Sequence, residues 1–250
     1  MKYIREFENH AAYEAAQSGL ILPNVSLCVN ENEVHYNPWV DPCASEKVKT
    51  TYEWVEIGGV KWATKNVGAL TITDYGQKFS WGGTKGYTND QVSGTCKSKA
   101  FSWTDYELGD GGFAPSNMTK YNSTDGKTVL EAEDDAATVN MGSGWRMPTT
   151  DEFQALGNAV TTAFTKVNNV YGLLCTDKTD SSKTLFFPAA GLCDNGSVYH
   201  VGNNGSYWSS SLNTSYAANG NRMNFYGVDM RWQTYGSRYY GLSVRGVFGQ

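Results

Sequence analysis

The sequence predicts an α+β protein in which short strands and ordered loops outweigh helices. Its 250 residues include 27 glycines, 16 tyrosines and 8 tryptophans, a composition typical of strands and turns. A complete helix-start signal stands at Thr149, so some helix is expected among the strands. The hydrophobic content of 40% is enough for a sizeable core, and the length predicts one or two domains.

Residues 1–50 predict a small helix-plus-hairpin module that ends in a linker. Asn9 is placed to cap a short helix over His10–Gln17. Apolar residues alternate with polar ones from Val25 to Tyr36, and the polar Asn30–Asn32 interrupts them, which predicts a hairpin. A unit this short can scarcely bury a core alone, so we expect it to dock on the main domain or on a partner chain.

Residues 51–250 predict a second, larger domain. Gly76–Pro115 is polar, aromatic and rich in glycine, which indicates loops with local hairpins. Short strands are expected elsewhere in this domain, over Glu53–Ile57, Val60–Thr64, Thr184–Phe187 and Ser197–His200.

Two helices are expected in the same domain. Thr149 and Glu152 form a capping box, followed at helical spacing by Phe153, Leu156 and Val160. A second, short helix is expected over Asp134–Asn140, with its apolar side chains facing inward, namely Ala136, Ala137 and Val139.

The last third of the chain has its own composition. No lysine follows Lys183 and no glutamate follows Glu152, while Asn, Ser, Tyr and Gly crowd the stretch Asn195–Gly241. Met223 and Phe225 alternate with polar residues, and Val228 and Met230 do so after Gly227, where the chain can turn. The pattern predicts a hairpin with one apolar face and one polar-aromatic face.

A polar-aromatic face of this kind favours ligand binding. Tyrosine, serine, asparagine and glycine make up antibody binding sites, and Tyr, Trp and Arg dominate interface hot spots. A merely solvated sheet surface is the alternative, but lysine and glutamate would normally populate it. The candidate ligand-binding residues are Asn213, Ser215, Tyr216, Asn219, Asn221, Asn224, Tyr226, Asp229, Arg231, Trp232, Thr234, Tyr235, Ser237, Tyr239 and Tyr240.

Charge and hydropathy argue against several partners. The net charge is −5 and no basic field is present, so nucleic acid is not an expected partner. No apolar run reaches the roughly 20 residues of a membrane span, and the start lacks the apolar core of a secretory signal. We expect no membrane insertion.

The residues that could carry chemistry are few and scattered. Five cysteines without a CxxC spacing favour free buried thiols over a disulfide framework or zinc site, and the three histidines lie far apart. The acidic pairs at Asp134 and Asp151 stand at helix starts, where they stabilise the helix dipole. Nucleophile-elbow and phosphate-binding motifs are missing from the sequence. We therefore expect a non-enzymatic protein that needs no cofactor and no metal.

Six phrases in order resemble a known family. They are GGVKWATKNVGA (58–69), YGQKFSWG (75–82), DDAATVNMGSGWRMPTTDEFQAL (134–156), FFPAAG (186–191), GSYWSSS (205–211) and GLSVRGV (241–247). Together they resemble the Fibrobacter succinogenes major paralogous domain, abundant in Bacteroidetes and their phages. GWRMPTTDEF is also similar to formylglycine-generating-enzyme-like domains. This resemblance implies a C-type lectin-like fold, in the formylglycine-generating-enzyme-like variant, over about Thr51–Val247.

The segment of about 207–240 is similar to the diversified region of diversity-generating-retroelement target proteins, among which the phage major tropism determinant is best known. In those proteins, adenine-directed mutagenesis scatters Asn, Ser, Tyr, Asp and Thr codons over a lectin-fold surface. The resemblance implies a receptor-recognition protein on a phage virion (tail) or bacterial cell surface. Its partner would be a variable protein or glycan on a cell surface, and a homo-oligomer is possible.

The same resemblance implies structural roles and leaves two alternatives. Trp145 would pack in the core, Arg146 would pair internally and Arg245 would tie down the last strand. A tail or fibre subunit that uses the polar-aromatic face for assembly is the first alternative. A formylglycine-generating-type enzyme is the second, but the paired cysteines of that family have no match at Cys175 and Cys193. The calcium tripeptides of sugar-binding lectins are also missing, which leaves only loop carboxylates as a chance calcium site, namely Glu107, Asp110, Asp177 and Asp180.

Overall fold

The computed structural model of the protein describes residues 29–30, 33–34, 51–113, 115–122 and 124–249. The chain divides into two compact units, Met1–Glu46 and Lys47–Gln250. The described part is mixed α+β, mostly short sheets with few helices, as the composition predicts. No helix among the described residues is long and apolar enough to cross a membrane.

The described part of the first unit is a short hairpin. β1 (Val29–Asn30) pairs antiparallel with β2 (Glu33–Val34), and Val29 lies opposite Val34. The predicted hairpin is confirmed at these residues. The helix expected over His10–Gln17 lies outside the described residues.

A four-stranded sheet joins distant parts of the second unit. It has the order β3 (Trp54–Ile57), β4 (Val60–Asn66), β16 (Arg245–Phe248) and β6 (Trp145–Arg146). The turn between β3 and β4 uses Gly58 and Gly59 at φ +62° and +76°, the left-handed backbone that a two-residue hairpin turn requires. The predicted strands here are confirmed, and the last strand of the chain lies between β4 and β6.

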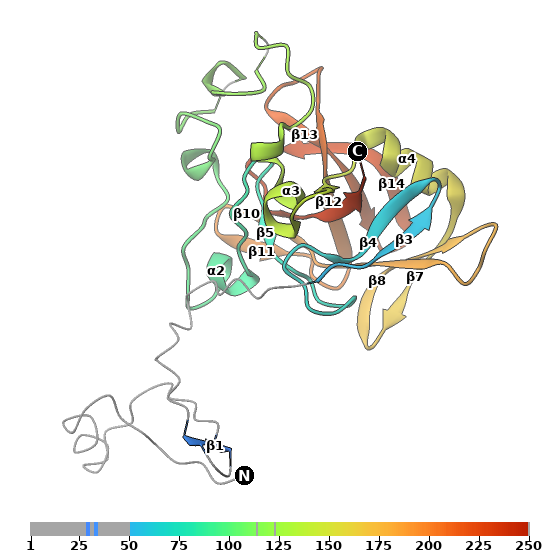
Figure 1. Ribbon diagram of the computed structural model, residues 1–250. Coiled ribbons are helices and arrows are strands. Elements are labelled where there is room, and N and C mark those ends of the chain that lie inside the picture. Colours follow the sequence, from blue (N-terminus) through green and yellow to red (C-terminus); the bar gives the residue numbers. More distant parts are fainter. Residues whose placement is uncertain (1–28, 31–32, 35–50, 114, 123, 250) are drawn as a thin grey trace, which may run out of the picture. The chain divides into compact units, whose positions relative to one another are not determined.

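A five-stranded sheet carries the Asn- and Tyr-rich stretch. Its order is β14 (Asp229–Ser237), β13 (Asn219–Tyr226), β12 (Asn204–Leu212), β15 (Leu242–Ser243) and β5 (Lys78–Phe79). Only β12 and β15 run parallel. Figure 1 shows β13 and β14 in red-orange, with α4 beside β14.

Two smaller sheets complete the strands. β7 (Val160–Val167), β8 (Val170–Asp177) and β9 (Thr184–Pro188) form an antiparallel sheet, and β10 (Leu192–Asp194) pairs with β11 (Ser197–Tyr199). The predicted strands over β9 and β11 are confirmed. The β7–β8 hairpin was not predicted, because its turn uses Asn168 and Asn169 at positive φ in place of glycine.

The helices are short and lie where their capping residues predict. α4 (Thr150–Ala159) begins at the capping box of Thr149 and Glu152, and Val160 leaves the helix to begin β7. α3 (Ala136–Met141) is capped by the Asp135 side chain. Val139 does not face inward as expected but is 47% exposed, and only Ala136 and Ala137 of this helix are buried. The other helical segments are α2 (Asn89–Ser93), η1 (Trp103–Asp105), η2 (Pro115–Asn117) and η3 (Ala132–Asp134).

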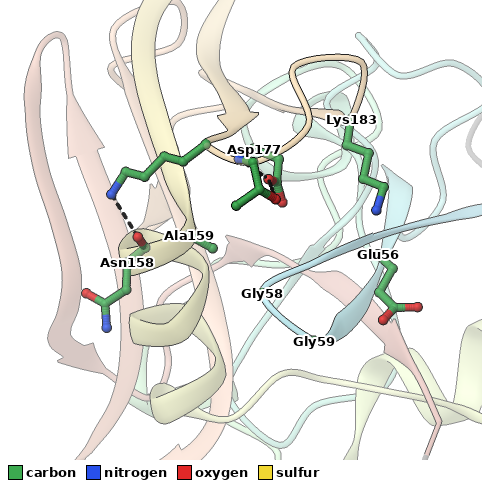
Figure 2. A pocket seen from close by; sticks show the side chains of 9 residues that line it. Glu56, Gly58, Gly59, Asn158, Ala159, Asp177 and Lys183 are labelled. Atoms are coloured by element: carbon green, nitrogen blue, oxygen red, sulfur yellow. Dashed lines mark hydrogen bonds between the residues drawn. The ribbon is translucent and has the colours of Figure 1, made fainter.

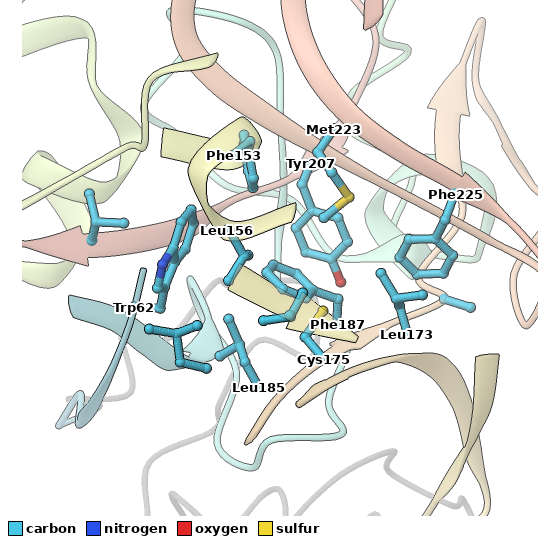
Figure 3. Close-up of a cluster of buried hydrophobic side chains, with 14 residues drawn as sticks. Trp62, Phe153, Leu156, Leu173, Cys175, Leu185, Phe187, Tyr207, Met223 and Phe225 are labelled. Atoms are coloured by element: carbon cyan, nitrogen blue, oxygen red, sulfur yellow. The ribbon is translucent and has the colours of Figure 1, made fainter. Parts of the chain in front are cut away.

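The largest described core cluster lies between α4 and the sheets (Figure 3). Phe153 of α4 packs 5.4 Å from Trp62 of β4, centroid to centroid. Tyr207 of β12 lies in the same cluster, with its hydroxyl donating to the Pro188 carbonyl at 2.7 Å. Met223 and Phe225 of β13 complete its upper side. The inward residues of the Asn- and Tyr-rich stretch are therefore part of the main core.

Buried cations tie distant segments of the framework together. Arg245 is fully buried and donates to Asn66 Oδ1 at 2.8 and 3.0 Å, to the Ala63 carbonyl at 2.9 Å and to the Phe186 carbonyl at 2.8 Å. Arg238, also fully buried, donates to the Tyr106 hydroxyl at 2.7 Å and to three carbonyls. Every such buried donor needs an acceptor, and these two guanidinium groups have theirs.

The structural roles implied for two further residues agree with this framework. Arg146 forms a bidentate ion pair with Glu152 at 2.6 and 2.8 Å. Trp145 is buried and packs edge-on against Phe248 of β16. Together these contacts fix α4 and the last strand beside β6.

Candidate ligand-binding face

The hairpin β13–β14 forms the outer edge of the five-stranded sheet. Gly227 turns the chain at φ +55°, and Tyr226 then pairs with Asp229. Val228 was predicted to lie on the apolar face, but it lies in the turn and is 87% exposed. Met230 does point inward, where it packs against the core beneath Phe225.

A β-bulge divides the predicted residues between two sides of the hairpin. The register of β13 and β14 shifts between Arg222 and Asn224, so that Asn224 pairs with Arg231 but Arg222 pairs with Thr234. Directly opposed residues of an antiparallel pair share a side, and one extra residue reverses the alternation that follows it. The single polar-aromatic face predicted from strict alternation is therefore wrong.

One side of the hairpin, which we call the arginine face, consists of Ser206, Arg222, Asn224, Tyr226, Asp229, Arg231 and Thr234. The opposite side, toward α4, carries Asn219, Asn221, Trp232, Tyr235 and Ser237. The remaining candidates lie in the turn Asn213–Ala218 and in the segment after β14.

Exposure separates the candidates further. Those that are exposed are Ser215, Tyr216, Tyr226, Asp229, Arg231 and Tyr235. Those that are half-buried are Asn213, Asn219, Asn221, Asn224, Trp232, Thr234, Ser237, Tyr239 and Tyr240. The exposed tyrosines thus border both sides of the edge hairpin and its neighbouring turn.

Several half-buried candidates hold the local structure. The Asn213 side chain accepts from the backbone N–H groups of Ser215 and Tyr216, which shapes the turn. Asn221 Nδ2 donates to the Leu212 carbonyl at 3.2 Å. Trp232 lies against α4, where a Cβ added at Gly157 would come within 2.5 Å of its indole nitrogen. Trp232 is thus a packing residue rather than a free surface ring, because a helix covers this side of the sheet.

Ser206 organises the polar groups of the arginine face. Its Oγ accepts from Asn224 Nδ2 at 2.7 Å and from Arg222 Nη1 at 3.4 Å, and it donates to Asn204 Oδ1 at 3.0 Å. Ser206 is fully buried, so this network lies at the floor of the face. Asn224 is held in place by it.

Arg222 is the one described arginine whose guanidinium has a buried atom without an acceptor. Its Nε is enclosed and makes no hydrogen bond. The hydrogen bond from its Nη1 to Ser206 Oγ is long, at 3.4 Å. An N–H group buried in this way costs about 1–3 kcal/mol. Burial lowers the pKa of Arg222 from its ordinary value, with the neighbouring Tyr240 acting in the opposite sense. Arg222 is not among the binding residues predicted from the sequence, although its alternation with Met223 assigns it to the polar side.

An aromatic cluster continues beyond the end of β14. Tyr239 packs 4.9 Å from Trp103, which in turn lies 5.5 Å from the exposed Phe113. Tyr240 lies 4.8 Å from Tyr239. On the arginine face, Tyr226 meets the His200 ring at 5.5 Å. Trp103, Phe113 and His200 extend the candidate surface, and no local pattern indicated them because they come from distant loops.

A pocket of about 410 Å³ lies away from the hairpin, between the β3–β4 turn, the end of α4 and the loop after β8 (Figure 2). Its lining includes Glu56, Lys183 and Asp177. The Asp177 carboxylate accepts from the Thr179 hydroxyl and from the backbone N–H groups of Thr179 and Asp180, which lowers its pKa.

The acidic cluster of Glu131, Glu133 and Asp134 already holds a cation of the chain itself. Lys120 Nζ lies 2.6, 2.7 and 2.5 Å from their carboxylate oxygens. The loop carboxylates considered for calcium are also engaged. Glu107 binds Lys99 Nζ at 2.9 Å, and Asp180 accepts from the backbone of Ser182.

The two free thiols that the structure describes are unsuited to nucleophilic attack. Cys175 and Cys193 are free and buried, and burial raises their pKa to about 12 and about 11. Cys96 is disulfide-bonded, so the expectation of free thiols is wrong there. A disulfide needs two Cα atoms within about 7 Å, a proximity that wide sequence spacing does not reveal.

Comparison of the chain with protein-family models, with curated proteins and with solved structures returns no match.

Proposed function

We propose that this protein is a non-enzymatic ligand-binding protein that displays a diversified Tyr/Asn/Ser-rich surface on a C-type lectin-like scaffold. Its role would be receptor recognition on a phage virion or bacterial cell surface, as in retroelement-diversified proteins. The observation that carries the proposal is the edge hairpin β13–β14. Met223 and Phe225 belong to the main core, while the exposed side chains of the hairpin are Tyr226 and Arg231 on the arginine face and Tyr235 on the opposite side.

The scaffold part of the proposal is supported by the positions of the six phrases. GGVKWATKNVGA covers β4, GWRMPT leads through β6 to α4, and GLSVRGV covers β15 and enters β16. β4, β16 and β6 are neighbours in one sheet. Phrases that are distant in sequence thus belong to one paired framework, with the Asn- and Tyr-rich stretch beside it.

The binding part is supported by chemistry. Tyrosine and arginine bury large areas and form hydrogen bonds, which is why they dominate interface hot spots. The hairpin holds the backbone of these residues in a hydrogen-bonded ladder. Binding a ligand therefore costs little further backbone conformational entropy.

The proposal is tested by removing exposed rings and assaying cell binding. The full chain, fluorescently labelled, is incubated with a panel of Bacteroidetes strains, and Tyr226→Ala combined with Tyr235→Ala is compared with Tyr171→Ala. Tyr171 is an equally exposed ring on β8, in another sheet. We expect labelling of at least one strain, its loss in the double variant and its retention in Tyr171→Ala.

The outcomes separate the proposal from the assembly alternative. Light scattering measures the mass of the same variants. If the double variant lost an oligomer while no strain was labelled by any form, the face would serve assembly in a tail or fibre. Equal labelling by all three proteins would contradict the proposed face.

A further inference from the structure

The arginine face carries two guanidinium groups on neighbouring strands. Arg231 of β14 lies directly opposite Asn224 of β13, and Arg222 lies two residues before Asn224 on the same side. Diagonal neighbours of this kind bring long side chains within reach of one another. Arg231 is exposed, and Arg222 lies deeper, beside the buried Ser206.

Neither arginine forms an ion pair with any described residue. The carboxylate nearest along the strands is Asp229, which pairs with Tyr226 and makes no described ion pair either. Asp194, beyond the face near Tyr239, accepts from Asn195 Nδ2 at 2.8 Å. The arginine face therefore has two guanidinium groups for one carboxylate.

Arg222 is held in position by its surroundings, but its Nε lacks an acceptor. A Cβ at Gly236 would lie 3.2 Å from the Arg222 Nε and 3.3 Å from the Tyr240 ring, so glycine leaves the room that the guanidinium fills. Ser206 Oγ is shared with Asn224 and already donates to Asn204. Arg222 Nε has no hydrogen-bond partner among the described residues.

We propose that Arg222 and Arg231 bind a carboxylate of an acidic protein segment, with Arg222 as the anchor and Arg231 as the outer contact. This inference rests on the proposed function and names the chemistry of its ligand. A guanidinium recognises a carboxylate through paired N–H groups, and a positioned arginine loses little freedom in doing so. Thr234 lies opposite Arg222 on the same face and adds a hydroxyl group for the peptide.

A protein partner fits this face better than a glycan. The hairpin presents strands with exposed tyrosines, and tyrosine and arginine are enriched in protein interfaces while lysine and glutamate are depleted. The chain matches that depletion, since no lysine follows Lys183 and no glutamate follows Glu152. Charge complementarity then calls for an acidic segment.

The test is a selection of yeast-displayed random twelve-residue peptides on the purified full chain, beside an array of neutral and acidic glycans. We expect selected peptides to be enriched in aspartate and glutamate. The best one, synthesised, should bind at least about tenfold more weakly to Arg222→Lys, which keeps the charge but not the paired N–H groups. Arg231→Met should weaken it less. Lys166→Ala, which removes an exposed cation on β7, should leave the affinity unchanged.

Each outcome decides between the two proposals. Peptides without acidic enrichment, or acidic peptides that bind Arg222→Lys as well as the native chain, would overturn the carboxylate inference and leave the binding function standing. Binding confined to the glycan array would overturn the protein partner. Absence of ligands on both arms, with no labelled cells, would overturn the proposed function itself. Circular dichroism of Arg222→Lys verifies that the variant is folded.

Discussion

Arg245 of β16 and Arg222 of β13 carry the same guanidinium group into two regions with different surroundings. Arg245 is enclosed by acceptors, with four hydrogen bonds of 2.8 to 3.0 Å. Arg222 has one hydrogen bond of 3.4 Å and an enclosed Nε without an acceptor. A buried guanidinium with a full set of acceptors holds a framework together, whereas the guanidinium of Arg222 keeps donors that the fold does not satisfy. The difference separates the part of the molecule that maintains the fold from the part that we assign to recognition.

The sharpest test of the framework is Arg245→Met. The variant leaves Asn66 Oδ1 and the Ala63 and Phe186 carbonyls without their donors in the core. We expect a loss of about 3–5 kcal/mol in the free energy of unfolding, measured by urea denaturation. A loss below about 1 kcal/mol would mean that Arg245 does not hold β4, β9 and β16 together.

The buried cation Lys78 makes the stability of the framework depend on pH. Lys78 is fully buried, and burial lowers its pKa from 10.5 to about 8, although its Nζ donates to the Ala190 and Gly191 carbonyls and to Ser243 Oγ. Between pH 8 and 10.5 the unfolded chain binds this proton and the folded chain does not, so stability rises with pH in that window.

The pH effect is measured as the difference in the free energy of unfolding between the native chain and Lys78→Met. The contributions of the other titrating groups are common to both proteins and drop out of this difference. The native chain should gain about 1.4 kcal/mol per pH unit relative to the variant between pH 8 and 10.5. Denaturation midpoints at half-unit intervals give this difference. A constant difference over the whole window would show that Lys78 keeps an ordinary pKa.

Trp232 tests where the framework ends and the displayed hairpin begins. Because its ring packs against Gly157 of α4, Trp232→Ala should lower the free energy of unfolding by about 2 kcal/mol. Gln233→Ala, at the exposed neighbouring position, should change it by less than about 0.5 kcal/mol. If both variants unfolded at the same urea concentration, Trp232 would belong to the displayed surface after all.

The smallest effect is expected for Arg222→Met. Removing a desolvated charge that lacks acceptors relieves a cost as it removes a contact, so the free energy of unfolding should change by no more than about 1 kcal/mol. Thermal unfolding beside Arg245→Met gives the comparison directly. A loss as large as that of Arg245→Met would assign Arg222 to the framework and remove the case for an anchor.

Sequence patterns predicted the elements whose signals are local. The capping box at Thr149 predicted α4, and the alternation around Met223 and Phe225 predicted a hairpin whose apolar side lies in the core. The features that were missed depend on distant residues. The bulge beside Arg222 reverses the alternation of β14, and Trp232 meets α4 only after folding. Arg222 could not be predicted as a binding residue, because its missing acceptor depends on residues that only the fold brings around it.

The ladder that joins β13 to β14 is made by main-chain groups, and such bonds are indifferent to the side chains that alternate above and below them. The outward side chains of the hairpin can therefore change while its backbone pairing stays the same. Related sequences should accordingly conserve Met223, Phe225, Met230, Trp232 and Gly227. Variable positions along this hairpin should alternate with conserved ones, and the alternation should shift by one residue at the bulge.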